Sequence, residues 1–188
     1  MLADYLDDDR VVIVEYDPRW PAAFEQEKSA VCAALSVLPT DIQHIGSTAI
    51  PGLHAKPVID LLVAVSSFAP VAEYEQRLEP LGYAHIVQPN EPVRIFFRKG
   101  SPRTHHLHIV EDGSCEHHRL IRFRDYLLRH PETALAYEDL KRDLAVRFAL
   151  DRPQYTESKT DFIQGVIALA DAELAGAGEG GQQARTPC

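Results

Sequence analysis

The chain has 188 residues, a hydrophobic fraction of 45% and a formal net charge of −9. This length and composition predict one globular domain with a sizeable core. The negative charge argues against general binding to nucleic acids or to anionic membrane surfaces, because a polyanion would be repelled. The sequence has no apolar run long enough to span a membrane and no signal-peptide pattern, and its three cysteines lack a metal-binding or redox spacing. We therefore expect a cytoplasmic protein.

The apolar pattern predicts a single domain over residues 11–175, between flexible termini at 1–10 and 176–188. Its first half, residues 11–114, carries strand patterns, and its second half, residues 115–175, carries helical patterns. The expected elements of the first half are a short strand or extended docking segment at 11–14, a helix over about 19–37, strands at 42–45 and 58–65, a helix over about 69–80, and strands at 83–87, 93–98 and 105–110.

The last three strands are separated by turn residues and predict an antiparallel meander. The helices that follow are interrupted at 130–131 and 151–153, where prolines occur. This order of elements is typical of an α+β domain with a mixed sheet. A doubly wound dinucleotide-binding fold is not indicated, because the G-x-G-x-x-G and Walker spacings are absent.

The most informative stretch runs from His44 to Val63. A strand breaks into a turn of Gly, Ser, Thr and Pro and then returns as an apolar strand. Small residues let a ligand approach backbone N–H groups, hydroxyls add donors, and a lysine adds positive charge. These features predict a phosphate site formed by Gly46, Ser47, Thr48 and Lys56.

Asp60 is the single carboxylate within the apolar run Val58–Val65. A strand of this composition is expected to be buried, so the carboxylate needs a hydrogen-bond donor, a cation or a metal ion. Asp60 is therefore the candidate catalytic residue.

Two histidines, His106 and His108, lie two positions apart on a predicted strand and so point to one face of the sheet. With Asp60 they would form a site that suits Zn, Mn, Ni or Fe better than the all-oxygen coordination preferred by Mg²⁺. Alternatively, one histidine hydrogen-bonds Asp60 and the other packs against an aromatic ring. The metal interpretation requires the two strands to be neighbours.

Several basic residues could complete an anion site. Arg94 and Arg98 share one face of their strand, so two guanidinium groups could point into a cleft. Arg124 and Lys159 are candidates from the helical half. Serine-based hydrolysis is not favoured, because Ser47 lies outside a G-x-S-x-G elbow.

Taken together, several separated motifs resemble the GrpB family. They are the run His44–Leu61, the segments His105–Glu111 and Phe123–Leu127, and Tyr155 with Lys159 before Phe162-Ile163. The resemblance extends over about residues 11–170. It implies a nucleotidyltransferase-like α+β fold, with a mixed sheet, flanking helices and a C-terminal helical half. Related domains occur fused to dephospho-coenzyme A kinase, where a folding-accessory role has been proposed.

Active nucleotidyltransferases of that superfamily carry Gly-Ser, a strand with Asp-x-Asp, and a third carboxylate on a neighbouring strand, which together hold two metal ions. By this resemblance Gly46-Ser47 is present and Asp60 is the second Asp, but Val58 stands in place of the first. The segment His106–His108 stands where the third carboxylate is expected. The resemblance thus implies either a His/Asp site for another metal ion or a loss of catalysis.

The leading hypothesis from the sequence is a protein that binds a nucleotide or another phosphorylated small molecule. A divalent ion (Zn, Mn, Ni or Mg) would be held by Asp60, His106 and His108, and metal-dependent nucleotidyl transfer would be the reaction. Metal-dependent hydrolysis of a phosphoester would use the same residues. The alternative is a non-catalytic folding-accessory or interaction domain with a degenerate active site.

Overall fold

In the computed structural model, which describes residues 10–89 and 93–178, five strands form one mixed sheet. In chain order they are β1 (Ile42–Ile45), β2 (Ile59–Val65), β3 (Tyr83–His85), β4 (Ile95–Lys99) and β5 (His105–Glu111). Their order across the sheet is β1-β2-β5-β4-β3, and β2 and β5 are parallel while the other neighbours are antiparallel. The predicted meander of the last three strands is therefore confirmed.

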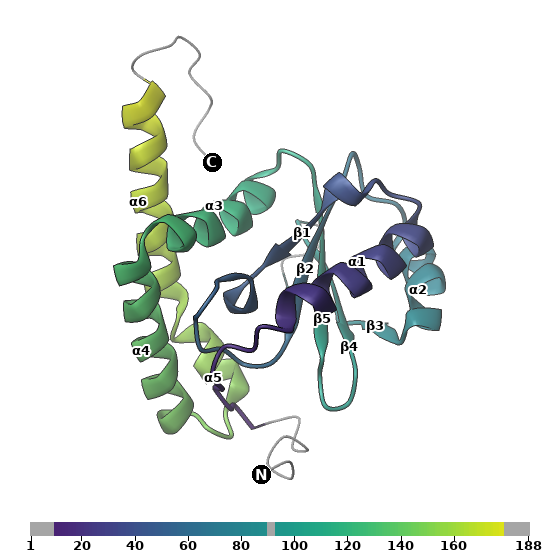
Figure 1. Cartoon of the computed structure of the whole chain (residues 1–188). Coiled ribbons are helices and arrows are strands. Elements are labelled where there is room, and N and C mark those ends of the chain that lie inside the picture. The colour runs from purple at the N-terminus through teal and green to yellow at the C-terminus, as the bar shows by residue number, and fades with distance from the viewer. Residues whose placement is uncertain (1–9, 90–92, 179–188) are drawn as a thin grey trace.

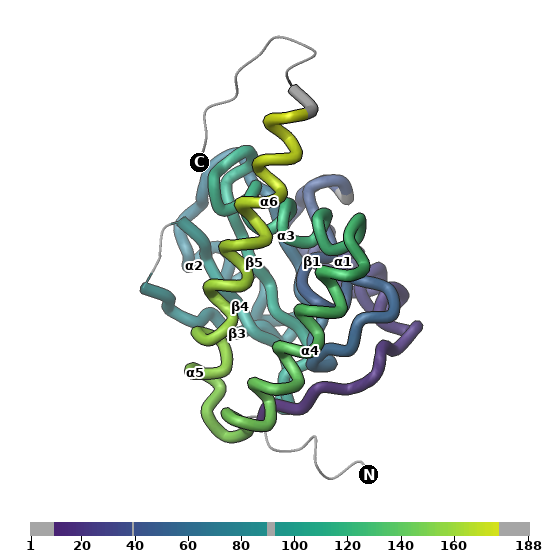
Figure 2. Tube along the Cα trace, turned by 90° about the vertical axis from the view of Figure 1, so that its left-hand side faces the viewer, coloured from purple at the N-terminus to yellow at the C-terminus, as the bar shows by residue number. Residues whose placement is uncertain are grey.

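Helices cover both faces of this sheet (Figure 1). On one face lie α1 (Trp20–Leu35) and α2 (Val71–Leu78). The other face is covered by the helical half, which Figure 2 shows in front of the sheet. It comprises α3 (Cys115–Arg129), α4 (Pro131–Arg147), α5 (Arg152–Glu157) and α6 (Thr160–Gly178). The predicted α+β class is confirmed, and no helix of the described residues is long and apolar enough to cross a membrane.

Three local features differ from the sequence prediction. Residues 11–14 form no strand with the sheet; Val14 instead makes an isolated bridge with Ala55. A helix, α5, begins at the predicted break, because the side chain of Asp151 caps it by accepting a hydrogen bond from Gln154 N. Residues 176–178, predicted as part of the tail, continue α6, since an alanine-rich helix propagates cooperatively. The other predicted flexible residues, 1–9 and 179–188, lie outside the described part of the chain.

Alternation along β2 and β5 separates two kinds of side chain. Leu61, Val63, Leu107 and Ile109 are fully buried in the core against α1 and α2. Their neighbours in sequence point toward the helical half. On that side Leu62 and Val110 pack with Leu120 and Ile121 of α3. This packing covers one end of the strands, and the polar residues lie toward the other end.

Candidate functional site

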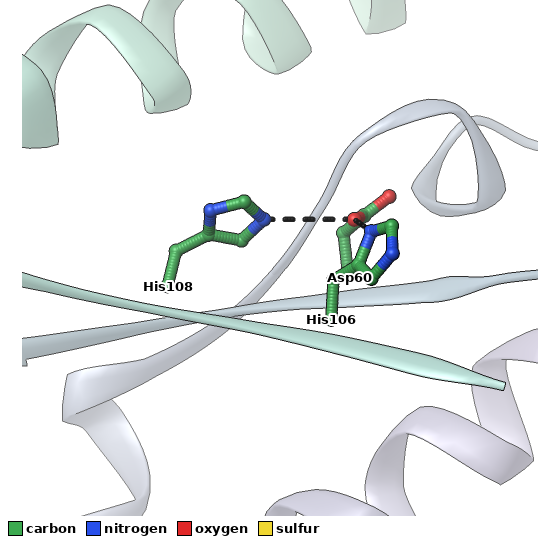
Figure 3. A group of neighbouring side chains, drawn as sticks. All are labelled: Asp60, His106 and His108. Carbon is green, nitrogen blue, oxygen red and sulfur yellow. Dashed lines mark hydrogen bonds and ion pairs between the residues drawn. The ribbon is translucent and has the colours of Figure 1, made fainter. Parts of the chain in front are cut away.

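The register of β2 and β5 places Asp60 directly opposite His106, and Leu62 opposite His108. His106 Nδ1 lies 2.9 Å from Asp60 Oδ1, and His108 Nε2 lies 3.6 Å from the same oxygen. Figure 3 shows the three side chains on the sheet face that looks toward the green helices, away from purple α1. The two strands are therefore neighbours, as the metal interpretation requires.

Phe96 of β4 contacts both imidazoles of this triad. Its ring centroid lies 5.2 Å from that of His106 and 4.9 Å from that of His108. Both elements of the alternative interpretation, a hydrogen bond to Asp60 and packing on an aromatic ring, thus occur at the same place. The ring fixes the histidines on one side and excludes water there.

The three residues offer one carboxylate oxygen and two imidazole nitrogens that all lie within 4.8 Å of one another. They form the one group of this kind among residues 10–89 and 93–178. Nitrogen and oxygen donors in this number fit a transition-metal ion such as Zn²⁺ or Mn²⁺, with further positions left for a ligand. The donor atoms are therefore chemically suited to a transition-metal ion.

The protonation states suit the same chemistry. Desolvation raises the pKa of Asp60, but the hydrogen bond from His106 and the electrostatic attraction of both histidines outweigh it and hold this pKa well below its usual range. Desolvation also lowers the pKa of His108, although the Asp60 charge opposes this shift. At neutral pH the site therefore holds a carboxylate and at least one neutral imidazole, which are the metal-binding forms.

The glycine-containing turn lies directly against Asp60. Gly46 has φ +72 and ψ −173, a conformation that favours glycine, and a Cβ on this residue would collide with Asp60 Oδ2. Ser47 begins a short 3-10 turn, and its side chain interacts with the Tyr137 phenol of α4. Thr48 is 1% exposed and donates its hydroxyl to Val58 O at 3.2 Å. Its hydroxyl thus ties the turn to the residue that precedes β2.

Lys56 and Lys159 lie within electrostatic range of Asp60, and both lie over one aromatic ring. Lys56 Nζ is 5.5 Å and Lys159 Nζ 4.5 Å from the ring centroid of Tyr155, a residue of α5 that is 1% exposed. The ammonium group of neither lysine forms an ion pair or hydrogen bond with any residue of the described ranges. The helical half therefore brings the amine of Lys159 close to that of Lys56, which lies between the glycine-containing turn and β2.

The pKa values of these amines reflect this environment. Desolvation and, to a smaller extent, the positive charge of Lys159 together lower the pKa of Lys56 to about 7. Desolvation lowers the pKa of Lys159 to about 8. In both cases the charge of Asp60 acts in the opposite direction. Two partly buried ammonium groups that lack a counter-charge are ready to bind an anion.

The predicted arginines occupy different surroundings. Arg94 and Arg98 do share the face of the triad, and each guanidinium lies over the Phe96 ring, at 5.8 and 5.4 Å from its centroid. Arg94 also lies 3.4 Å from the buried carboxylate of Glu116. Arg124 donates to Gln43 Oε1 and to His44 O, which ties α3 to β1.

Two features of the site were not predicted from the sequence: the burial of Glu116 and the contact of Tyr155 with two lysines. Glu116 is 8% exposed and is held by Arg119 Nε at 2.6 Å and Nη2 at 2.8 Å. A glutamate in a first helical turn usually faces solvent, so nothing in the residue pattern indicated its burial. Tyr155 was visible within the motif pattern, but its position between two lysines depends on how α5 sits over the sheet.

The chain also has a groove of about 550 Å³ away from the triad. It lies beside the carboxyl end of β2 and is lined by residues such as Ser36, Asp41, Ser66 and Arg77. None of the triad residues, and neither Lys56 nor Lys159, lines it. We assign the candidate site to the triad, because there the ligand atoms converge and the unpaired amines lie alongside.

The fold and this site define an α+β domain with a carboxylate and two histidines on the sheet face covered by the helical half. A family model described as GrpB protein matches residues 10–168. The chain belongs to the GrpB family.

Similar proteins come from several bacteria. A UPF0157 protein of Pseudomonas aeruginosa is 38% identical over 173 residues, which cover 87% of this chain and 69% of that protein. The crystal structure of the conserved protein GrpB from Enterococcus faecalis superposes with a TM-score of 0.78 at 34% identity, covering 87% of this chain and 99% of that one. A dephospho-CoA kinase of Mycolicibacterium paratuberculosis is 27% identical over 186 residues, but the match covers only 46% of the kinase.

Proposed function

We propose that this protein binds a phosphorylated small molecule, with a nucleotide as the first candidate, together with a divalent metal ion on Asp60, His106 and His108. The observation that carries the proposal is the position of two unpaired lysines, Lys56 and Lys159, beside a carboxylate–histidine triad. A phosphate placed there would meet ammonium groups on one side and the metal-binding atoms on the other.

Each residue has a defined task in this proposal. A bound metal ion would polarise the phosphate and stabilise negative charge as it develops. Asp60 and the two histidines hold the ion, with Phe96 fixing both imidazole rings. Lys56 and Lys159 bind phosphate oxygens, and Gly46 leaves room for the Asp60 carboxylate. Nucleotidyl transfer to a small acceptor is the reaction we would test first.

One observation favours the non-catalytic alternative. Val58 precedes Asp60 by two positions, on the same face of the chain, and is 7% exposed. Its carbonyl oxygen accepts a hydrogen bond from the Thr48 hydroxyl. A second carboxylate that could hold another metal ion is therefore absent from this position. The partial match to a dephospho-CoA kinase is compatible with an accessory domain of a larger protein.

Nucleotide binding tests the proposal directly. Calorimetric titrations with AMP, ADP and ATP, each with Zn²⁺, Mn²⁺ or Mg²⁺, should give binding to the wild-type chain. Asp60→Asn should abolish it, whereas Asp139→Asn, which removes an exposed carboxylate of α4, should not. Absence of binding in every combination would overturn the proposal. If binding is found, release of pyrophosphate separates transfer from a purely binding role.

A further inference from the structure

The charges around the triad are unbalanced toward the positive. Asp60 is the one carboxylate of the triad. Desolvation lowers the pKa of Arg94, Lys56 and Lys159, and the charge of Asp60 opposes this shift in each, so these three cations lie within its electrostatic range. The charge of Arg94 is offset by Glu116 at 3.4 Å. The immediate surroundings of the metal-binding atoms are thus basic in a protein whose net charge is −9.

This imbalance opposes the binding of a bare metal ion. A divalent cation on the triad would be attracted by one carboxylate and repelled by the two lysine ammonium groups, since the Arg94 guanidinium is paired with Glu116. Repulsion is least screened where side chains are partly buried, as they are here. The histidines supply lone pairs but no negative charge. The triad alone is therefore a chemically suitable but electrostatically weak metal site.

A bound phosphate would both attract the metal ion and offset the positive charge of the lysines. Its oxygens can coordinate the metal ion while the lysines bind the remaining oxygens. The amines of Lys56 and Lys159 are already held against the ring of Tyr155, so little ordering of them is needed. Conversely, a phosphate without the metal ion would place its charge next to the Asp60 carboxylate, a local repulsion that a metal ion between the two would remove. Each ligand removes a repulsion that opposes the other.

We propose that the site binds metal ion and phosphate cooperatively, as one metal–phosphate unit, and that the phosphate carries at least two negative charges. This inference rests on the proposed function and adds to it a mutual dependence of the two ligands. A divalent ion and two ammonium groups leave a large positive excess after Asp60 is counted. A singly charged ligand such as a simple carboxylate would not neutralise it, whereas a phosphate monoester or anhydride would.

The test measures Mn²⁺ affinity of the metal-free full chain by electron paramagnetic resonance, with and without saturating inorganic phosphate. We expect phosphate to tighten Mn²⁺ binding at least tenfold, a coupling of about 1.4 kcal/mol. Lys56→Met and Lys159→Met should each raise the Mn²⁺ affinity measured without phosphate and reduce the factor by which phosphate tightens Mn²⁺ binding. Mn²⁺ alone should bind more tightly, because a repulsion is lost, and the gain from phosphate should shrink toward one.

A matched control is Lys28→Met, which removes a lysine of α1 on the opposite face of the sheet and should keep the wild-type coupling. Circular dichroism confirms that each variant is folded. Equal Mn²⁺ affinity with and without phosphate would overturn the cooperativity while leaving the proposed function intact. Wild-type coupling in both lysine variants would overturn the role of the lysines. If Mn²⁺ binds under neither condition, this inference and the proposed metal site both fail.

Discussion

The two faces of the sheet use the same strands for opposite purposes. On the side of α1 and α2, Leu61, Leu107 and Ile109 are fully buried in a continuous apolar core. On the side of the helical half, the alternating neighbours include Asp60 and His106, which are only partly buried. One face buries apolar surface, and the other holds charges close together at an electrostatic cost.

This difference suggests a division of labour. The apolar face supplies the stability that allows the polar face to keep unpaired amines and a carboxylate in a partly buried place. Substitutions on the first face should then affect folding, and substitutions on the second should affect ligands. We therefore expect the loss of unfolding free energy to decrease from substitutions on the apolar face to substitutions on the polar face.

The largest effect on stability is expected for Leu107→Ala. Leu107 is 0% exposed, so the truncation leaves a cavity and should lower the free energy of unfolding by about 2–5 kcal/mol. Urea denaturation followed by circular dichroism measures this. Once the folded fraction is taken into account, Mn²⁺ and phosphate binding should match the wild type. A selective loss of binding in folded protein would show that the faces are not independent.

Gly46→Ala should have the next largest effect, because this glycine matters both for backbone stability and for the position of Asp60 in the site. Its positive φ would strain an alanine, which costs about 1–3 kcal/mol, and the added Cβ would push Asp60 Oδ2 aside. We expect lower stability in urea together with at least tenfold weaker Mn²⁺ binding in the presence of phosphate. Gly113→Ala is a suitable control, since that glycine also has a positive φ, +69, but no atom within 4 Å of its added Cβ. It should lose stability without losing binding.

Asp60→Ala should change stability least among these substitutions. Removing a carboxylate that serves a ligand should abolish binding and shift the free energy of unfolding by less than about 1 kcal/mol in either direction. A loss of about 1–3 kcal/mol would instead identify Asp60 as a structural partner of His106 and favour the accessory-domain alternative. Thermal and urea unfolding of the ligand-free proteins distinguish the two results.

Much of the site could be predicted from strand alternation alone. Alternation placed His106 and His108 on one face and identified Asp60 as a buried carboxylate in need of a partner. It could not show that β2 and β5 are neighbours, because parallel pairing joins segments far apart in the chain and depends on the whole sheet. The burial of Glu116 and the contact of Tyr155 with two lysines were hidden for the same reason, since both depend on how the helical half packs.

The pH dependence of stability should show the electrostatic cost of the lysines on the polar face. Lys56 and Lys159 have folded-state pKa values of about 7 and about 8, below the ordinary value of 10.5. Between these limits the unfolded chain binds more protons than the folded one, so stability without ligand should rise as pH increases from about 7 to about 10.5. Urea titrations at several pH values would show this slope. Lys141, whose pKa desolvation lowers to about 7, contributes to it as well.

Bound phosphate should reverse the preference of Lys56 and Lys159, because an adjacent anion stabilises their ammonium forms. Phosphate binding at pH 8 should therefore take up protons, and affinity should fall as pH rises above about 8. Calorimetry in buffers of different ionisation enthalpy counts these protons. Lys159→Met should reduce the uptake, whereas Lys28→Met should leave it unchanged. Binding without proton uptake would mean that the amines do not meet the phosphate, and the charge on this face would then need another explanation.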